Sequence, residues 1–321
     1  MTTPLPVAGL TPYCTPELLT QASTGVSWSS IPAGSNVSPE QRLAEQSNIC
    51  ARSTAMVDGV CHQPLRATID TLILYGPGAR VGAPRGGCGD ATLIMTRCPV
   101  LEVVSVQVAQ NRLPYVWTTV PAGLYQVQYP PAGLYGSTAP PAAGEGGQGI
   151  LVSSEYVNGR YGRNGLAVQV QYVNGWPHAG LTAIATPAVS PAVQTIQVDD
   201  CAGWVIAAAL NGATGATGTA YDAAAQEVIQ VTAASASQGP GTLTLATPLT
   251  YEHAAGVMVS TLPQTVVQAA ILFGAAQALT RGATSTTTRQ VPATGASGTS
   301  RIADFKKDAK ALLVGTFDRV I

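Results

Sequence analysis

The strongest pattern of hydrophobic positions lies near the carboxyl end, where it predicts two helices joined by a polar loop. The first predicted helix, residues 263–279, is apolar on nearly every side and lies in a stretch without charge between Glu252 and Arg281. A helix without a polar face must be enclosed, so we expect neighbouring protein to cover it, partly from other copies of the chain. The run is too short for a bilayer, and three glutamines interrupt it: Gln264, Gln268 and Gln277.

The second predicted helix, residues 300–320, is amphipathic. Its apolar side chains fall near one stripe, and we predict that they hold the helix against a helical bundle or against a partner protein: Phe305, Leu312, Leu313, Phe317 and Val320. The loop between the helices is rich in Thr, Ser and Gly. Three arginines are spaced along it and its flanks, where they are candidates for contact with DNA phosphates: Arg281, Arg289 and Arg301. A flexible linker is the simpler interpretation of this loop.

Two further helices are predicted near the amino end. Thr15 precedes a proline at the first position of a short helix. Ser38 and Gln41 form a capping-box pattern at the start of a longer helix that ends at Gly59 or Cys61, before a proline. Residues 1–37 otherwise read as an extended arm.

The pattern then changes to the alternation of β-strands. Strands are expected over residues 67–74, 92–95, 100–108, 124–129, 150–153 and 166–173. Residues 133–149 read as an exposed loop. Asn158-Gly159 and Asn174-Gly175 predict hairpin turns, because both residue types tolerate positive φ.

A third block, residues 186–261, predicts a small β-sandwich or barrel inserted before the first C-terminal helix. Strands are expected at 193–198, 204–208, 227–231, 242–245 and 257–260, with turns at 200–203, 211–218 and 239–241. The predicted fold is α+β. A core of helices and β-hairpins covers residues 38–185 and 262–321, with the helices from both ends packed together and the β segments projecting from them.

Charge is scarce in this chain of 321 residues. It has 16 basic and 17 acidic residues, 10% of the total, where roughly 25% is ordinary. A high-GC genome explains this composition, and so does burial of much of the surface in an assembly. The net charge of −1 argues against a protein that binds nucleic acid through a dense basic patch. A near-neutral channel that DNA passes through remains compatible with it.

Candidate chemistry is sparse. The six cysteines contain no C-x-x-C pair, and Cys61-His62 alone places two metal-ligand types side by side, so buried isolated thiols are favoured over zinc. Asp199-Asp200 and the pair Asp222 and Glu227 are read as turn caps in preference to a cation site.

Catalysis receives little support from the sequence. The only histidines, His62, His178 and His253, are each expected to be hydrogen-bonded turn residues. No Walker, H-E-x-x-H or G-x-S-x-G motif occurs. We therefore expect no enzyme, no catalytic residue and no cofactor or metal. The first residues lack a signal-peptide pattern, which places assembly in a reducing cytoplasm.

Several short motifs resemble one family. The segment from Leu262 to Ala269 fits an LP-x-x-[VI]-x-x-A helix, and Leu312-Leu313 fits a short LL helix near the carboxyl end. With the segments 97–103, 162–165, 172–177 and 251–256, the chain resembles the head-to-tail connector (adaptor) proteins of long-tailed bacteriophages, in the enlarged form found in actinobacteriophages. The inserted β block departs from the smallest family members.

The resemblance implies a structural protein of the virion neck, assembled in the host cytoplasm, without an active site and without a membrane. Such a protein forms a ring, usually of twelve copies, between the portal protein and the stopper or tail terminator, and double-stranded DNA passes through it without sequence-specific binding. The alternative is a phage tail-tip or receptor-binding protein whose β-rich middle is a ligand module. A hydrolase is a further alternative, and it would need a pocket that joins His178 or His253 to a nucleophile.

Overall fold

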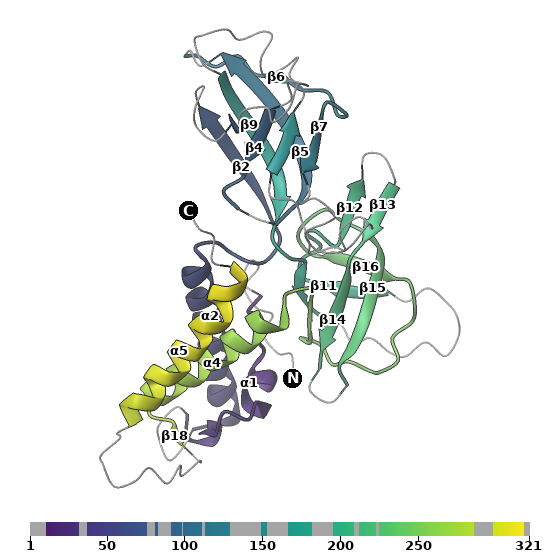
Figure 1. Ribbon diagram of the computed structural model, residues 1–321. Helices are drawn as coiled ribbons and strands as arrows, with labels where there is room; N and C mark the ends of the chain where they lie inside the picture. The colour runs from purple at the N-terminus through teal and green to yellow at the C-terminus, as the bar shows by residue number, and fades with distance from the viewer. Residues whose placement is uncertain are drawn as a thin grey trace.

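The computed structural model describes residues 11–31, 37–75, 81–82, 91–97, 99–110, 113–128, 149–152, 166–181, 195–208, 212–222, 225–285 and 298–317. These residues form three bodies that meet near one point: a helical bundle, a two-sheet sandwich and a curled sheet (Figure 1). Each body has a hydrophobic core of its own. The predicted α+β class is confirmed.

The bundle combines helices from both ends of the chain: α1 (Pro16–Gln21), α2 (Pro39–Cys61), α4 (Gln264–Thr280) and α5 (Gly298–Phe317). The predicted caps are confirmed. Thr15 accepts the amide of Leu18 at 3.2 Å, and Ser38 and Gln41 exchange side-chain-to-backbone hydrogen bonds of 3.0 and 3.2 Å. A short 3-10 helix, η1 (Trp28–Ser30), follows β1 (Val26–Ser27), which pairs with β18 (Thr284–Ser285).

The apolar helix α4 is covered by this chain itself. It packs against α1, α2 and α5, and its buried residues are Val266, Val267, Ala269, Ala270, Ile271, Phe273, Gly274, Ala275, Ala276 and Ala278. The expectation that other copies of the chain must help to enclose it is therefore wrong. The sequence alone did not reveal that α2 packs against α4, because α2 lies more than two hundred residues earlier in the chain. Among the described helices, none has the length and hydropathy that a bilayer crossing requires.

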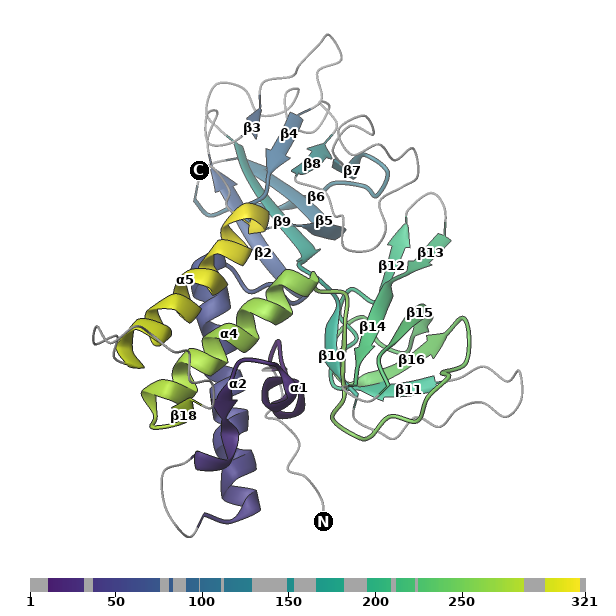
Figure 2. The ribbon, with the colours of Figure 1, turned by 60° about the horizontal axis from the view of Figure 1, so that its bottom comes forward.

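The sandwich consists of two four-stranded antiparallel sheets (Figure 2). One has the order β2 (Thr68–Tyr75), β9 (Leu166–Asn174), β5 (Val100–Gln110), β6 (Thr118–Thr119), and the other has the order β3 (Val81–Gly82), β4 (Ala91–Ile94), β8 (Gly149–Val152), β7 (Tyr125–Gln128). Side chains of both sheets meet in one core, including Leu74, Val106 and Val170 from the first and Leu93 and Ile150 from the second. The predicted strands are confirmed, but β2 and β5 both pair with the distant β9.

The hairpin predicted at Asn174-Gly175 is wrong. Gly175 does adopt a positive φ of 95°, but the chain leaves the sandwich there. The next strand, β10 (His178–Gly180), pairs with β17 (Met258–Ser260) in the curled sheet. The chain passes from the sandwich to the curled sheet at Gly175. Glycine suits this position because φ is positive and because an added Cβ would lie 2.5 Å from the Arg66 carbonyl oxygen. Asn158-Gly159 lies outside the described residues.

The curled sheet has the order β10, β17, β14 (Thr217–Tyr221), β15 (Glu227–Ala234), β16 (Gly241–Leu245), β11 (Thr195–Val198). Its two edge strands meet at an isolated antiparallel bridge between Leu181 and Val198, around a core that includes the fully buried Trp204. A separate hairpin is formed by β12 (Val205–Ala208) and β13 (Gly212–Gly215). The sheet therefore occupies most of the predicted block 186–261 and also includes β10, which precedes it.

The turn predicted at residues 211–218 is wrong, because this segment contains β13 and the start of β14. Its glycines permit close approach and do not mark a turn. An added Cβ at Gly215 would lie 1.5 Å from the Val231 carbonyl oxygen, and one at Gly218 would lie 2.9 Å from the Trp204 ring.

The three bodies are joined at a junction built from the links between them. The Ala67 amide donates to the Trp176 carbonyl at 2.7 Å, and the Trp176 amide donates to the Leu65 carbonyl at 2.8 Å. Gly203 lies so close to the base of the sandwich that an added Cβ would be 2.8 Å from Leu101 Cδ1. The link from α2 to β2 is thus hydrogen-bonded to the link from β9 to β10.

Candidate functional site

The apolar stripe of α5 faces the bundle. Leu313 is fully buried, and Phe305 and Leu312 are partly buried against the same core. Of the two destinations predicted for these side chains, the bundle is therefore the one that they occupy. The side chain of Phe317 and the whole of Val320 lie outside the described part of the chain.

The predicted DNA-contacting arginines have partners within the protomer. Arg281, at the end of α4, has its Nε 2.5 Å from Glu45 Oε1 on α2. Arg301 donates to the Thr24 carbonyl at 2.8 Å, and its guanidinium lies 5.4 Å from the centre of the Phe305 ring. Both side chains therefore brace the bundle, although Arg281 is still 42% exposed. Arg289 lies outside the described residues.

The outward side of α5 carries mixed charge. Asp304, Lys307, Asp308 and Lys310 are exposed, and Val314 is an exposed aliphatic side chain beside them. Opposite signs alternate here, so the surface lacks the dense positive charge of a nucleic-acid site.

Buried polar groups gather where the amino-terminal arm meets the junction. The Tyr13 hydroxyl donates to Asp58 Oδ1 at 2.6 Å and accepts the amides of Leu65 and Arg66 at 2.8 and 3.2 Å. The Tyr13 amide donates to Thr54 Oγ1 at 2.9 Å. Burial, and next the Asp58 carboxylate, raise the pKa of the Tyr13 phenol, and burial also raises the pKa of Asp58. Tyr13 thus connects the arm, α2 and the link into the sandwich.

His178 lies in the same region, and the prediction that it is a turn residue is wrong. It belongs to β10 and is buried, with its Nδ1 2.8 Å from Ser260 Oγ and its Nε2 near the carbonyl oxygens of Thr11 and Pro12. Burial lowers the pKa of His178 to about 4, although the carbonyl contacts act in the opposite direction. The ring is therefore neutral at neutral pH, with its proton on Nε2.

The contact between His178 and Ser260 bears on the hydrolase alternative. Because Nε2 donates to main-chain carbonyls, Nδ1 must accept the Ser260 hydroxyl proton, and Ser260 Oγ also accepts the Leu262 amide at 3.0 Å. Ser260 is 1% exposed. The Ser260 hydroxyl is therefore buried. The His178 ring is oriented by main-chain carbonyl oxygens, whereas a catalytic triad uses a carboxylate for this purpose. These contacts attach the arm to the curled sheet and give a hydrolase no support.

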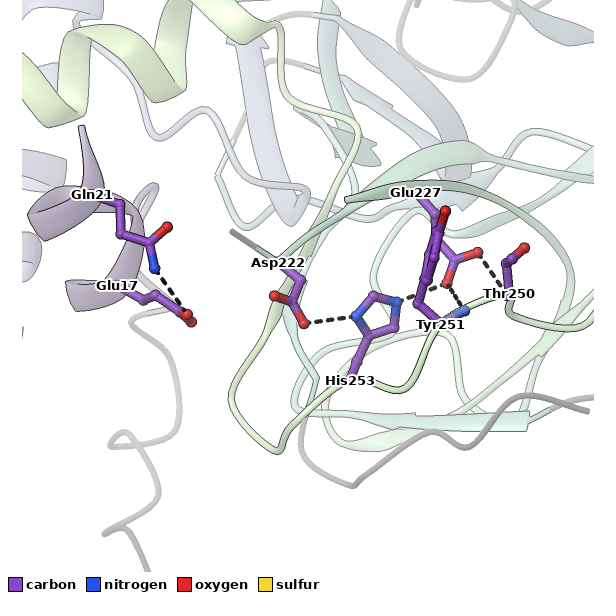
Figure 3. Close-up of polar contacts among 7 residues, drawn as sticks. All are labelled: Glu17, Gln21, Asp222, Glu227, Thr250, Tyr251 and His253. Carbon is purple, nitrogen blue, oxygen red and sulfur yellow. Dashed lines mark hydrogen bonds and ion pairs between the residues drawn. The ribbon is translucent and has the colours of Figure 1, made fainter. Parts of the chain in front are cut away.

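The second buried histidine, His253, lies between two carboxylates (Figure 3). Its Nδ1 is 3.0 Å from Asp222 Oδ2 and its Nε2 is 2.8 Å from Glu227 Oε1. The Glu227 carboxylate also accepts the amides of Thr250 and Tyr251 at 2.8 and 3.3 Å. The expected turn-capping role is confirmed for Glu227, and sequence reasoning missed the histidine that joins it to Asp222.

The other acidic pair also caps backbone. Asp200 accepts the amides of Ala202 and Gly239 at 3.0 and 2.9 Å, as predicted. Asp199 accepts the Gly180 amide at 2.6 Å and the Thr11 hydroxyl. Within the described ranges, no group of three or more His, Cys, Asp or Glu is placed to hold a metal ion.

Two of the cysteines are neighbours, although isolated thiols were predicted. A hydrogen bond with Cys50 lowers the pKa of Cys14 against the effect of burial, and the same bond raises the pKa of Cys50. Cys14 Sγ also lies 3.7 Å from Ser53 Oγ. Cys61 and Cys201 are free thiols as well, and Cys88 and Cys98 lie outside the described residues.

An aromatic cluster on the outer face of the sandwich was not predicted. The rings of Tyr75 and Tyr115 are 6.1 Å apart, and those of Tyr115 and Trp117 are 5.4 Å apart. Leu113 and Val116 beside them are 77% and 78% exposed. The signal was present in β2, where Leu72, Ile73, Leu74 and Tyr75 are apolar on both faces. An edge strand of this kind has a second apolar surface to cover.

No family model, curated protein or solved structure matches this chain.

Proposed function

We propose that this chain is a head-to-tail connector of a long-tailed bacteriophage, which forms a ring between the portal and the stopper or tail terminator. The observation that carries the proposal is the bundle itself. The LP-x-x-V-x-x-A motif, Leu262 to Ala269, leads into α4, which packs against the capped helix α2 and against α5, where Leu312-Leu313 contact the same core. The motif residues thus form one structural unit, from which both β bodies project.

The surface gives further support. Exposed apolar side chains lie on all three bodies, including Leu43 on α2, Val314 on α5, Val116 near the sandwich and Val228 on the curled sheet. Together with the scarcity of charge, this surface suits a protomer with neighbours on several sides. The apolar character of α4 does not itself support a ring, because α1, α2 and α5 of the same chain cover this helix.

The experiment is negative-stain imaging of the purified chain, alone and with its cognate portal, together with imaging of gently disrupted virions. A ring with an axial hole, docked on the portal, is expected in one of these preparations. Monomers throughout, or trimeric rods, would contradict the proposal.

Truncation after Gly298 tests the role of α5, and it should leave heads unable to join tails. Because Ala309 and Leu313 are fully buried in the bundle, this truncation also removes part of the core. Leu313→Ala is therefore the control, since it weakens the same core by about 2–5 kcal/mol while keeping the outward side of α5. Normal infectious particles from the truncated chain would refute the assignment.

The aromatic cluster favours the second candidate function, a tail-tip or receptor-binding protein. Tyr75, Tyr115 and Trp117 form an aromatic cluster on a β body, with Tyr75 exposed and the other two rings half-buried, as a ligand module could present. The terminal helical pair α4 and α5 is not expected of that class. Binding of the purified chain to host cells, lost in Trp117→Ala, would support this function over the connector.

A further inference from the structure

Cys14 of the amino-terminal arm and Cys50 of α2 lie side by side in the core of the bundle. Both are free thiols, both are fully buried, and their side chains share a hydrogen bond. They are 36 positions apart in the sequence, so their contact depends on how the arm lies on the helix. The proposed connector function makes no use of them.

Several contacts fix the position of the arm on α2. The Tyr13 amide donates to Thr54 Oγ1 at 2.9 Å, and Thr54 Oγ1 donates to the Cys50 carbonyl at 3.0 Å. Cys14 Sγ lies 3.7 Å from Ser53 Oγ, which donates to the same carbonyl at 2.8 Å. Two successive residues of the arm therefore contact the one turn of α2 that begins at Cys50. The two thiols meet because this turn receives the arm.

We propose that Cys14 and Cys50 are a cross-linking site, at which a peroxide joins the two thiols in a disulfide that fastens the arm to α2. The sulfur atoms are already in hydrogen-bond contact, so they have only to close to the roughly 2 Å of an S–S bond. The cross-link goes beyond the connector function and holds for any role of the chain.

The reaction balances with one peroxide for each pair of thiols. Cys14 is the first nucleophile, because the hydrogen bond with Cys50 lowers the pKa of Cys14 and raises that of Cys50. Its thiolate attacks one peroxide oxygen, the O–O bond breaks, and a sulfenic acid forms while the departing hydroxide takes up the proton that Cys14 lost. The Cys50 sulfur then attacks the Cys14 sulfur, and the hydroxyl leaves with the Cys50 proton as a second water. Two electrons pass from the thiols to the peroxide.

Both sulfur atoms are buried, so a peroxide reaches them only when the arm lifts from α2. Local openings of this kind expose buried groups without global unfolding. The Tyr13 hydroxyl opposes the opening, because it donates to Asp58 of α2 at 2.6 Å. Tyr13→Phe should therefore speed the cross-linking about fivefold or more. An equal rate in wild type and Tyr13→Phe would contradict this route.

Tryptic digestion separates the two cysteines for the direct test. Cleavage after Arg42 and Arg52 gives residues 1–42 and 43–52, with one cysteine in each peptide. The native full chain is treated with hydrogen peroxide at neutral pH, unfolded in the presence of N-ethylmaleimide and digested without reduction. We expect one cross-linked species, two hydrogen atoms lighter than the sum of the two peptides. Separate peptides with blocked thiols, or Cys14 oxidised to a sulfinic acid, would overturn the proposal.

Serine variants provide the matched controls. Cys14→Ser and Cys50→Ser should each abolish the cross-linked species, whereas Cys201→Ser should keep it. If a variant of the pair does not fold, the digest of the wild type still decides.

The second readout is urea unfolding with and without a reductant. Closing the loop between Cys14 and Cys50 should lower the unfolding equilibrium constant of the oxidised wild type about thirtyfold or more. Cys14→Ser should show no such difference. An unchanged constant in the cross-linked wild type would mean that the bond does not fasten the arm, and it would contradict the proposal.

Discussion

At the scale of single residues, Tyr13 does more than fill space. One hydroxyl serves Asp58 on α2 and two amides of the link between α2 and β2, and the ring lies edge-on to His178 with centroids 5.3 Å apart. Asp58, the two amides and His178 thus come from three different parts of the fold: α2, the link that follows it, and β10. The hydroxyl therefore fixes the arm, the bundle and the entrance to the sandwich together.

Tyr13→Phe should lower the free energy of unfolding by about 1–3 kcal/mol, because it leaves the Arg66 amide and one Asp58 oxygen without the partner they have now. Urea unfolding followed by circular dichroism measures the loss. Tyr251→Phe, which removes a hydroxyl from an exposed ring, is the matched control, with an expected change within about 0.5 kcal/mol. Equal effects in the two variants would show that the buried hydroxyl has no special role.

His178 should make stability depend on pH in the acidic range. Its pKa is about 4 in the folded protein and about 6.5 when unfolded, so the unfolded chain takes up a proton first as the pH falls. Its contribution is fully present above pH 6.5 and disappears between pH 6.5 and 4, a loss of about 3 kcal/mol. Unfolding free energies of wild type and His178→Gln across this range give the comparison. The wild type should decline more steeply, and His62→Gln should behave as wild type.

At the scale of elements, two glycines in different surroundings respond in opposite ways to the same substitution. Gly215→Ala forces a Cβ onto the Val231 carbonyl oxygen, and we expect a loss of about 3 kcal/mol or more. Gly59→Ala places its Cβ in open space within α2, and we expect a gain of about 0.5–1 kcal/mol. Thermal melts of both variants test the pair, and a tolerated Gly215→Ala would mean that β13 is not packed this closely on β15.

Sequence reasoning predicted the helices well because their signals are local. The caps at Thr15 and Ser38 and the apolar run after Pro263 each depend on neighbours within a few residues. The pairing of β2 with β9, about a hundred residues away, has no such signal. The segments that contain Gly175 and Gly215 were predicted to be turns, but in the structure each glycine lets another backbone segment approach closely. The sequence does not distinguish these two uses of glycine.

The candidate sites were predicted less completely for the same reason. The stripe of α5 was identified from its period, but whether it faced a partner or the bundle depended on where α4 lies. The partners of His178 and His253 come from segments up to 167 residues away. Polar side chains of this kind become a cluster only when the fold brings their segments together.

At the scale of the whole molecule, the exposed patch near the sandwich separates the two candidate functions. Leu113→Ser combined with Val116→Ser should leave the melting temperature unchanged, because both side chains are mostly in solvent. A connector should then lose ring assembly at least tenfold by native mass spectrometry, whereas a receptor-binding protein should lose attachment to cells. Val228→Ser, a single exposed valine on the curled sheet, is the control. If neither property changes, this patch belongs to neither contact.

The distribution of the bundle over both ends of the chain has a consequence for synthesis. As the chain leaves the ribosome, α1 and α2 emerge first, but their core partner α4 follows only after both β bodies. The sandwich and the curled sheet can therefore close while the first helices still expose Leu19 and Ile49. A chaperone that shields these side chains during translation would act on the amino end, and release would follow translation of the final helix.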